Sequence, residues 1–297
     1  MAKLFGQAAV QFKIRINPLL ETWVEKYLPA DYSAGCIFTP VEGLSSESWR
    51  IEAASGVYLA RLQSTEKRQL GIDRRRENRL LRHLSSKHIA PQVYAWACPW
   101  LVVNWIAGET LDDKHFFAAQ PQQQLAALLA KLHRSQPCGE TLDIKKRFAD
   151  YWQLIDRRRL TPSWLHLHKR LLKQRLPRAL KISLAHMDIH PQNWVNSPEG
   201  IRLIDWEYAV SADIGLEFAA LFSGNAYSKT QRYELLQQYA RQGGYGDAAK
   251  LERQVRQWRL WLEYLMLMWF EVRWQQTADI RYASWAQPLR QKLLSEF

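Results

Sequence analysis

The sequence has few cysteines and no long hydrophobic run. Its three cysteines, Cys36, Cys98 and Cys138, form no C-x-x-C pair, and their odd number is typical of a protein from a reducing compartment. No N-terminal stretch combines a basic start, an apolar run and a small-residue cleavage site. The most apolar window, Trp261 to Phe270, contains Glu263 and is about half as long as a membrane-spanning helix. We therefore expect a cytoplasmic protein that does not insert into the membrane.

Acidic residues are also in the minority. The chain has 41 Lys and Arg against 29 Asp and Glu, a formal net charge of +12, which raises nucleic acid as a partner. The basic clusters Arg74 to Arg76 and Arg157 to Arg159 lie far apart and occur in helical patterns without a known nucleic-acid-binding signature. We interpret them as solvated helix faces and expect no nucleic-acid partner.

The most informative stretch runs from Leu184 to Asn193 and contains His-Met-Asp-Ile-His-Pro-Gln-Asn. His186 precedes Asp188 by two residues and Asn193 follows it by five, which is the spacing of a kinase catalytic loop. A further carboxylate, Asp205, comes soon after this loop.

The segment between these motifs predicts a β-hairpin. Trp194 to Asn196 and Ile201 to Ile204 flank the turn Ser197-Pro198-Glu199-Gly200, which has Pro at its second position and Gly at its fourth. Such a hairpin brings Asn193 and Asp205 to the same end.

These residue types suit phosphoryl transfer from ATP, which needs a group that orients the attacking hydroxyl and oxygen ligands for Mg²⁺. We assign the first task to Asp188. Asn193 and Asp205 are the candidate Mg²⁺ ligands, and His186 is expected to orient the loop. Either motif alone is compatible with turn and capping residues, whereas both together favour a catalytic site.

With Ala212-Asp213-Ile214-Gly215-Leu216-Glu217 after them, these motifs resemble the aminoglycoside phosphotransferase and choline kinase superfamily, and within it the bacterial thiamine kinases. The resemblance runs from about Pro18 to the end and is strongest after Leu184. It implies a protein-kinase-like, two-lobed α+β fold. We expect an N-terminal lobe with a small antiparallel sheet over residues 1–106 and a mainly helical C-terminal lobe over 107–297. Residues 1–16 match nothing in the family and are expected to be loose or to pack on the first lobe.

Three parts of the N-terminal lobe are candidates for ATP binding. Gly43, Ser45 and Ser46 precede the expected hairpin of residues 49–53 and 57–62 and resemble the family's nucleotide loop, although a plain hairpin edge is the alternative. Arg61 stands where kinases carry a phosphate-binding Lys, and Glu77, in an expected helix from Arg74 to Leu84, is its natural partner. The alternative is a solvent-facing pair of charges.

The apolar run from Trp100 to Ile106 predicts a buried strand that leads into the hinge between the lobes. By the resemblance, the backbone of Asn104, Trp105 and Ile106 takes the adenine ring. A core position for Trp105 is equally compatible with the sequence.

The resemblance implies ATP- and Mg²⁺-dependent phosphorylation of the primary hydroxyl of thiamine to thiamine monophosphate. A thiazolium cation suits aromatic faces and a carboxylate. The candidate acceptor residues are Trp206, Glu207, Tyr208, Trp269 and Glu271. Asp213 resembles the buried Asp that holds the catalytic loop through backbone N–H groups. The competing interpretations are a kinase for choline, ethanolamine, an aminoglycoside or a sugar, and a basic nucleic-acid-binding protein on an inactive kinase scaffold.

Overall fold

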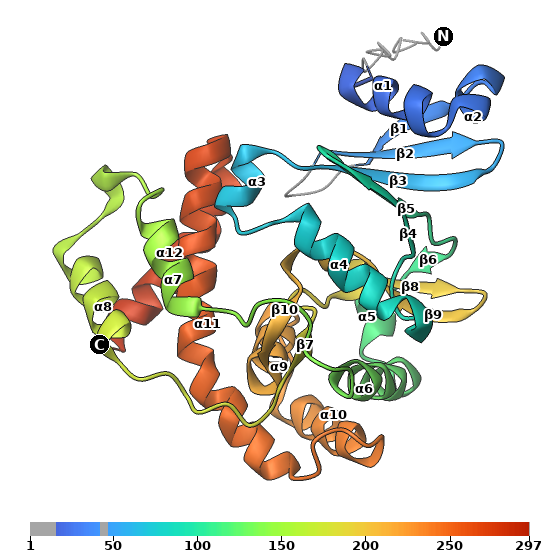
Figure 1. Ribbon diagram of the computed structural model, residues 1–297. Helices are drawn as coiled ribbons and strands as arrows, with labels where there is room; N and C mark the ends of the chain where they lie inside the picture. Colours follow the sequence, from blue (N-terminus) through green and yellow to red (C-terminus); the bar gives the residue numbers. More distant parts are fainter. Residues whose placement is uncertain (1–15, 42–46, 297) are drawn as a thin grey trace, which may run out of the picture.

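The computed structural model describes residues 16–41 and 47–296 (Figure 1). Gly43, Ser45 and Ser46 lie outside the described residues. The first element is helix α1 (Pro18–Tyr27), which begins at Pro18 because the Asn17 side chain caps it by accepting a hydrogen bond from the Leu19 amide at 3.0 Å. A short helix, α2 (Pro29–Ala34), follows directly.

Five strands of the described chain form one antiparallel sheet. In their order across the sheet they are β1 (Ile37–Val41), β2 (Ser48–Ala53), β3 (Gly56–Leu62), β5 (Trp100–Asn104) and β4 (Val93–Ala97). The predicted hairpin is β2 and β3, in which Arg50 lies opposite Leu59 and Ser48 opposite Arg61. Leu59 in turn lies opposite Val103 of β5.

The two faces of this sheet are covered by different helices. On one face, Trp49, Ile51 and Val102 pack in one hydrophobic cluster with Leu20 and Val24 of α1. The other face contributes Leu101 and Val103 to the main core, together with three leucines of α4, Leu80, Leu81 and Leu84. Helix α4 (Arg74–Leu84) has the predicted bounds and is preceded by the short helix α3 (Thr65–Gln69). Alternate residues of β5 therefore serve both cores.

After β5 the chain runs to strand β6 (Glu109–Thr110), which pairs with β8 (Trp194–Ser197). A Cβ on Gly108 would lie 2.2 Å from the backbone oxygen of Asn196, so only glycine permits this close approach. Strand β8 also pairs with β9 (Gly200–Leu203), as the turn residues predict. The segment that follows the large sheet is thus held beside the hairpin that follows the catalytic loop.

Strand β7 (Ile182–Ala185) ends immediately before His186 and pairs with β10 (Val210–Asp213). The remainder is mostly helical. The α-helices that follow β6 are α5 (Asp113–Phe116), α6 (Ala119–His133), α7 (Ile144–Trp152), α8 (Pro162–Lys173), α9 (Ile214–Gly224), α10 (Lys229–Arg241), α11 (Ala248–Thr277) and α12 (Ile280–Ser295). Short 3₁₀ turns are η1 (Ser85–Lys87), η2 (Arg157–Arg159), η3 (Pro191–Asn193) and η4 (Trp206–Tyr208).

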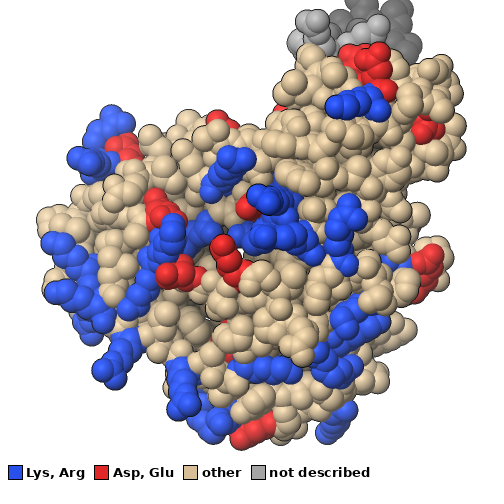
Figure 2. Space-filling view, viewed as in Figure 1, with Lys and Arg blue, Asp and Glu red and all other residues tan. Residues whose placement is uncertain are grey.

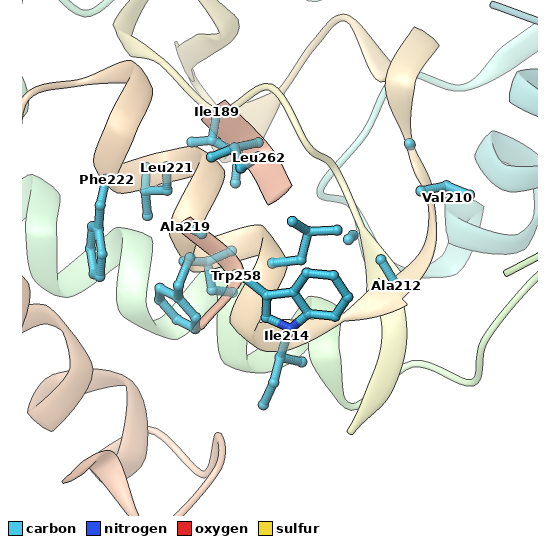
Figure 3. Packing of buried hydrophobic residues seen from close by; sticks show 14 of the residues in the cluster. Ile189, Val210, Ala212, Ile214, Ala219, Leu221, Phe222, Trp258 and Leu262 are labelled. Atoms are coloured by element: carbon cyan, nitrogen blue, oxygen red, sulfur yellow. The ribbon is translucent and has the colours of Figure 1, made fainter. Parts of the chain in front are cut away.

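The 30-residue helix α11 runs along the helical part and packs against α9, α12 and α7 (Figure 1). Figure 3 shows Trp258 of α11 beside Ile214 and Ala219 of α9, in the main hydrophobic core. The apolar window from Trp261 to Phe270 lies inside α11, and most of its side chains are buried. Within residues 16–41 and 47–296, none of the helices has the length and apolar content needed to cross a bilayer.

Candidate active site

His186 is fully buried at the end of β7 and fixes the loop that follows. Its Nε2–H donates to the backbone oxygen of Ile204 at 2.9 Å, and its Nδ1 accepts from the Asp188 amide at 3.3 Å. The imidazole also packs on the Trp206 ring, with centroids 4.6 Å apart. Burial lowers the pKa of His186 to about 4. The side chain is therefore neutral at pH 7, and its contacts orient the loop.

The backbone of the same loop is held by Glu217 of α9, which is fully buried. The amides of His186 and Met187 donate to its carboxylate at 2.6 and 3.2 Å. Met187 has a φ of +68°, a conformation that a non-glycine residue adopts only when its surroundings impose it. Burial raises the pKa of Glu217 to about 7, while the two amides oppose that rise.

The loop-holding role expected of Asp213 was therefore wrong. Its carboxylate caps α9 by accepting from the Gly215 amide at 3.3 Å, and it receives the side-chain donors of Gln254 and Trp258 at 2.5 and 2.7 Å. Asp213 thus ties α11 to β10. Asp213 and Glu217 are one helical turn apart in the sequence, so spacing alone did not decide which of them faces the loop.

The Asp188 carboxylate is 40% exposed. Asn193 Nδ2 donates to the Asp188 backbone oxygen at 2.9 Å and to Oδ2 at 3.4 Å. Desolvation by the surrounding protein, followed by the negative charges of Asp205 and Glu207, raises the pKa of Asp188 above its usual range. Only the ionised form of this carboxyl can accept a proton, and a cation held by Asn193 and Asp205 would favour that form.

A cavity of about 480 Å³ opens beside Asp188. Its lining includes Asp113 and Phe117 from the region of α5 and Asn225 from the end of α9. Asp188 thus borders open space that a small molecule can enter.

Asn193 and Asp205 are neighbours, as the predicted hairpin requires, because the Ile204 amide donates to the Asn193 backbone oxygen at 2.9 Å. Asp205 adopts a left-handed conformation with φ +62°, and its side chain is one-third exposed. Since Asn193 Nδ2 is turned to Asp188, its Oδ1 is the atom available to a cation. An amide oxygen and a carboxylate fit Mg²⁺, which takes hard ligands and only one or two of them from protein. Over residues 16–41 and 47–296, no group of three or more His, Cys, Asp or Glu is arranged for metal binding.

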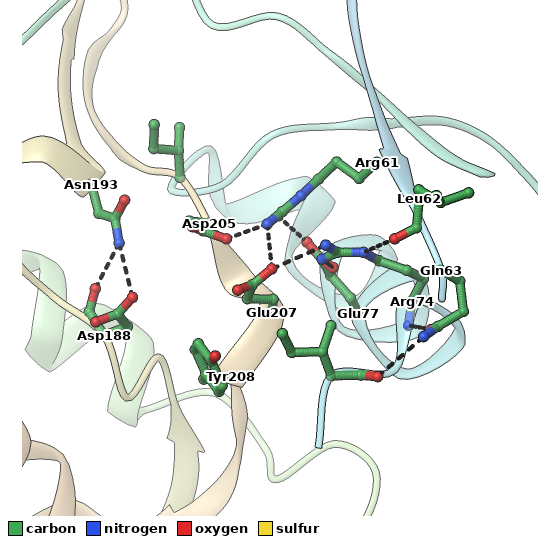
Figure 4. Close-up of polar contacts among 12 residues, drawn as sticks. Arg61, Leu62, Gln63, Arg74, Glu77, Asp188, Asn193, Asp205, Glu207 and Tyr208 are labelled. Atoms are coloured by element: carbon green, nitrogen blue, oxygen red, sulfur yellow. Dashed lines mark hydrogen bonds and ion pairs between the residues drawn. The ribbon is translucent and has the colours of Figure 1, made fainter. Parts of the chain in front are cut away.

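A buried network of charges stands beside Asp205 (Figure 4). Arg61 of β3 is only 5% exposed, and its guanidinium donates to Glu77 at 2.6 Å and to Glu207 at 2.8 Å. It also forms an ion pair with Asp205. Arg74 donates to the same two glutamates, to Glu77 at 2.5 Å and to Glu207 at 3.0 Å. The Arg61–Glu77 pair that the sequence suggested is present and is buried.

Comparisons with known proteins bear on this arrangement. Residues 38–286 match the model of the phosphotransferase enzyme family. The thiamine kinase of Escherichia coli O157:H7 is 39% identical over 209 residues, which cover 69% of this chain and 72% of that protein. The chain belongs to the phosphotransferase enzyme family.

Solved structures agree with the fold of this phosphotransferase. A choline kinase from Streptococcus pneumoniae has a TM-score of 0.71 at 18% identity and covers 94% of this chain and 100% of that chain. The complex of the same kinase with AMP gives 0.70 at 18% identity and covers 94% and 99%. The kinase-like α+β fold, with a small antiparallel sheet followed by a mostly helical part, is confirmed.

Three of the five predicted acceptor residues are buried and make contacts within the protein. Glu207 is 1% exposed and is bound to the two arginines of the network. Trp206 is equally buried, and its indole N–H donates to the Leu203 oxygen at 2.7 Å. Glu271 is buried on α11 and pairs with Arg159. Contrary to the prediction, the structure gives these three side chains structural roles.

Tyr208 and Trp269 are different, because both side chains are partly exposed. The Trp269 indole N–H donates to the Tyr208 hydroxyl at 2.9 Å, and the ring centroids are 6.5 Å apart. Figure 4 shows Tyr208 between Asp188 and the charge network. These two aromatic rings therefore remain candidates for an acceptor surface.

The basic clusters of the phosphotransferase are not simply solvated helix faces. Arg74 is fully buried, so the interpretation was wrong for this residue, whereas its neighbour Arg75 is exposed. Arg159 lies in the 3₁₀ turn η2 and neutralises buried Glu271. In Figure 2 the basic side chains on this face are spread over the helical part, with acidic ones among them.

Two of the three hinge residues expected to take adenine have amides that already donate hydrogen bonds within the protein. The Asn104 amide donates to the Gln92 oxygen and the Trp105 amide to the Val57 oxygen, both at 2.9 Å. Of the three residues expected to take adenine, Ile106 is left as the candidate amide donor. The Trp105 side chain is 38% exposed, so the alternative of a core position is wrong.

Proposed function

We propose that this phosphotransferase transfers the γ-phosphate of ATP to the primary hydroxyl of thiamine and forms thiamine monophosphate. The observation that carries the proposal is the meeting of Asp188, Asn193 and Asp205 with Arg61 of the sheet, in a chain 39% identical to thiamine kinases. Residues 1–106 and 107–297 act as the two lobes, with the nucleotide between them. The AMP complex of the structurally similar choline kinase supports a nucleotide as co-substrate.

Arg61 is the proposed contact for the ATP phosphates. Its Nη2 reaches Asp205, whose side chain is one-third exposed, so the guanidinium lies next to a proposed Mg²⁺ ligand, where a phosphate would be bound. Glu77 and Glu207 accept hydrogen bonds from the Arg61 guanidinium, and Arg74 binds the same two carboxylates. The side-chain oxygens of Asn193 and Asp205 are the proposed Mg²⁺ ligands. When bound, Mg²⁺ supplies positive charge that neutralises the phosphate oxygens during transfer.

Asp188 is the proposed catalytic residue. Its carboxylate accepts a hydrogen bond from the acceptor hydroxyl and orients that oxygen toward the γ-phosphorus. As the new O–P bond forms and the bond between the γ-phosphorus and the β,γ-bridging oxygen breaks, Asp188 takes the hydroxyl proton and ADP leaves. Asp188 must be ionised to take that proton, and positive charge bound by Asn193 and Asp205 would favour the ionised form.

The acceptor is proposed to bind against Tyr208 and Trp269, since flat aromatic faces attract a thiazolium cation. Several features argue against an aminoglycoside, which carries several positive charges and calls for a heavily acidic rim. Residues 233–297 hold more Lys and Arg than Asp and Glu. Two of the acids expected at the site, Glu207 and Glu271, are already neutralised by arginines.

The test is an acceptor screen with one enzyme preparation, ATP and Mg²⁺. We expect kcat/KM for thiamine to exceed that for choline, ethanolamine, kanamycin and simple sugars. The Asp188→Asn variant is the control, because turnover that survives this change arises from a contaminating kinase. If choline or kanamycin exceeds thiamine, the substrate assignment fails and the phosphotransferase assignment stands.

A further inference from the structure

A second cavity, of about 940 Å³, lies in the helical part of the protein. One wall is the loop of residues 174–180 between α8 and β7, and the other is the first half of α11. Figure 1 shows this loop crossing α11 on its way to β7. The loop enters β7 at the end opposite to His186, and the cavity shares no lining residue with the one beside Asp188. The two cavities are therefore separate.

The segment that forms the loop wall is strongly basic. Residues 169–181 hold six Lys and Arg and no Asp or Glu, in a chain whose formal net charge is +12. Lys169, Arg170 and Lys173 lie on the last turns of α8. Arg175 and Arg178 follow the end of that helix, so the solvated face of a helix does not account for them.

The lining of this second cavity carries positive charge only. Arg175 and Arg178 line it from the loop and Lys250 from α11, and all three residues are exposed. Within residues 16–41 and 47–296, none of their side chains forms an ion pair or a hydrogen bond. No Asp or Glu is found among the described residues that line the cavity. Three positive charges therefore surround this space without a negative charge to balance them.

Acidic residues close to Lys250 in the sequence are bound elsewhere. Asp247 caps α11 and accepts a hydrogen bond from the Lys250 amide at 2.8 Å. Glu252 forms an ion pair with Arg256, one helical turn further along α11, at 2.8 Å. Neither carboxylate is therefore directed at the cations of the cavity.

The two walls of the cavity are joined by a buried side-chain amide. Gln254 of α11 is 5% exposed, and its Nε2 donates to the Arg178 backbone oxygen at 2.9 Å and to the Asp213 carboxylate at 2.5 Å. Asp213 also accepts a hydrogen bond from the Leu180 amide at 3.3 Å. These contacts fix the loop against the helix, so the backbone that carries Arg178 keeps its place beside Lys250.

We propose that this cavity binds a small molecule that carries a diphosphate group. One phosphate carries a charge of about −1.5 to −2 at pH 7, so two phosphates match the three cations better than one does. The guanidinium groups of Arg175 and Arg178 also offer forked donors that fit phosphate oxygens. Cations gathered around a cavity suit a compact anion, whereas a nucleic-acid strand calls for a longer basic groove. This site is additional to the proposed active site.

Calorimetry with inorganic pyrophosphate, in the absence of Mg²⁺, tests the proposal. The double variant Arg178→Gln/Lys250→Gln should bind pyrophosphate about 10-fold more weakly than the wild type, the effect of losing two partly exposed ion pairs. The matched control is Arg241→Gln/Arg253→Gln, which removes two exposed arginines outside the cavity and should bind as the wild type does. Orthophosphate should bind the wild type more weakly than pyrophosphate.

Hydrogen exchange locates the bound anion independently of the variants. Pyrophosphate should slow amide exchange in residues 174–181 and leave the catalytic loop, residues 186–193, unchanged. Methyl diphosphate then distinguishes the two sources of the group. It should bind more weakly than pyrophosphate if the natural ligand is the free anion, and at least as tightly if the natural ligand is an ester.

Three results would overturn the proposal. A wild-type protein that does not bind pyrophosphate removes it directly. The same loss of affinity in both double variants would show that pyrophosphate responds only to overall charge. Full affinity in Arg178→Gln/Lys250→Gln, with exchange slowed in residues 186–193, would place the anion in the proposed active site. None of these results bears on the acceptor screen, which tests the proposed function separately.

Discussion

Arg61 Nη2 and Glu207 Oε2 are 2.8 Å apart, although 146 residues separate them in the sequence. The pair joins strand β3 of the sheet to the turn η4 that follows Asp205. Both side chains are almost fully buried, and Arg74 approaches the same Glu207 oxygen at 3.0 Å. Removing one member of such a network leaves an uncompensated buried charge, which is costly.

The first prediction concerns Arg74, whose guanidinium binds Glu77 and Glu207 and also donates to the Leu62 backbone oxygen at 3.4 Å. Arg74→Met removes its charge and leaves Glu77 and Glu207 with one arginine between them. We expect the free energy of unfolding to fall by about 3–5 kcal/mol, the usual cost of breaking a buried ion pair. Urea denaturation measures it, with Arg75→Met as the matched control because Arg75 is adjacent and exposed. If Arg74→Met lowers the free energy of unfolding no more than Arg75→Met does, the network contributes no stability through Arg74.

The second prediction concerns Asp188. Asp188→Asn preserves the shape of the side chain and removes its ability to take a proton. We expect kcat to fall by about 10²–10⁴, the usual contribution of a general base, with ATP affinity nearly unchanged. Steady-state kinetics and calorimetry separate the two effects. A variant with the wild-type kcat would contradict the catalytic assignment.

The third prediction concerns the proposed Mg²⁺ ligands. Asp205→Ala should shift the Mg²⁺ dependence of the rate to higher concentration, and Asn193→Ala should do so more mildly, because a carboxylate is the stronger ligand. The rate is measured against Mg²⁺ concentration at fixed ATP. An unchanged titration in Asp205→Ala would make its ion pair with Arg61 the whole of its role.

The fourth prediction concerns stability in acid. Burial, helped by the charge of Lys181, lowers the pKa of His133 to about 3, and burial lowers that of His168 to about 4. In the unfolded chain both histidines have a pKa of about 6.5. Below that pH the unfolded state therefore binds protons that the folded state does not bind. Each histidine should therefore reduce the free energy of unfolding by about 2 kcal/mol between pH 7.5 and 5.

Chemical denaturation at these two pH values tests this, with one variant at a time. His133→Gln and His168→Gln should each lose about 2 kcal/mol of the pH dependence. His166 is exposed and two residues from His168, so His166→Gln is the control and should behave as wild type. If all three variants keep the full pH dependence, these histidines do not cause it.

Local spacing predicted much of the site. The catalytic loop, the hairpin that brings Asn193 to Asp205 and the helix that presents Glu77 to Arg61 all follow from turn chemistry and helical periodicity. Ion-pair partners that are far apart in the sequence were harder to predict. Glu207 follows Asp205 by only two residues, and the left-handed backbone of Asp205 and the turn η4 direct it to the arginines.

The burial of Arg74 could not be predicted for a related reason. Three consecutive arginines look alike in a sequence, and the difference between them depends on Glu207, 133 residues away. The roles of the acceptor residues could not be predicted from the sequence either. An aromatic or acidic side chain at a position that resembles the family can contribute to packing as well as to binding. Trp206 and Glu271 serve packing and charge neutralisation here.

Helix α4 is fastened to the helical part at two points: the Arg74 guanidinium binds the Glu207 carboxylate, and Arg76 donates to the Glu207 backbone oxygen at 3.3 Å. In protein kinases the corresponding glutamate-bearing helix can swing outward, and that swing switches the enzyme off. Here an outward swing would separate Arg74 from Glu207 and Glu77 from Arg61, while the Arg74–Glu77 pair on α4 would stay intact. Any movement of α4 in this protein is therefore linked to the position of Glu207, which follows Asp205 by two residues.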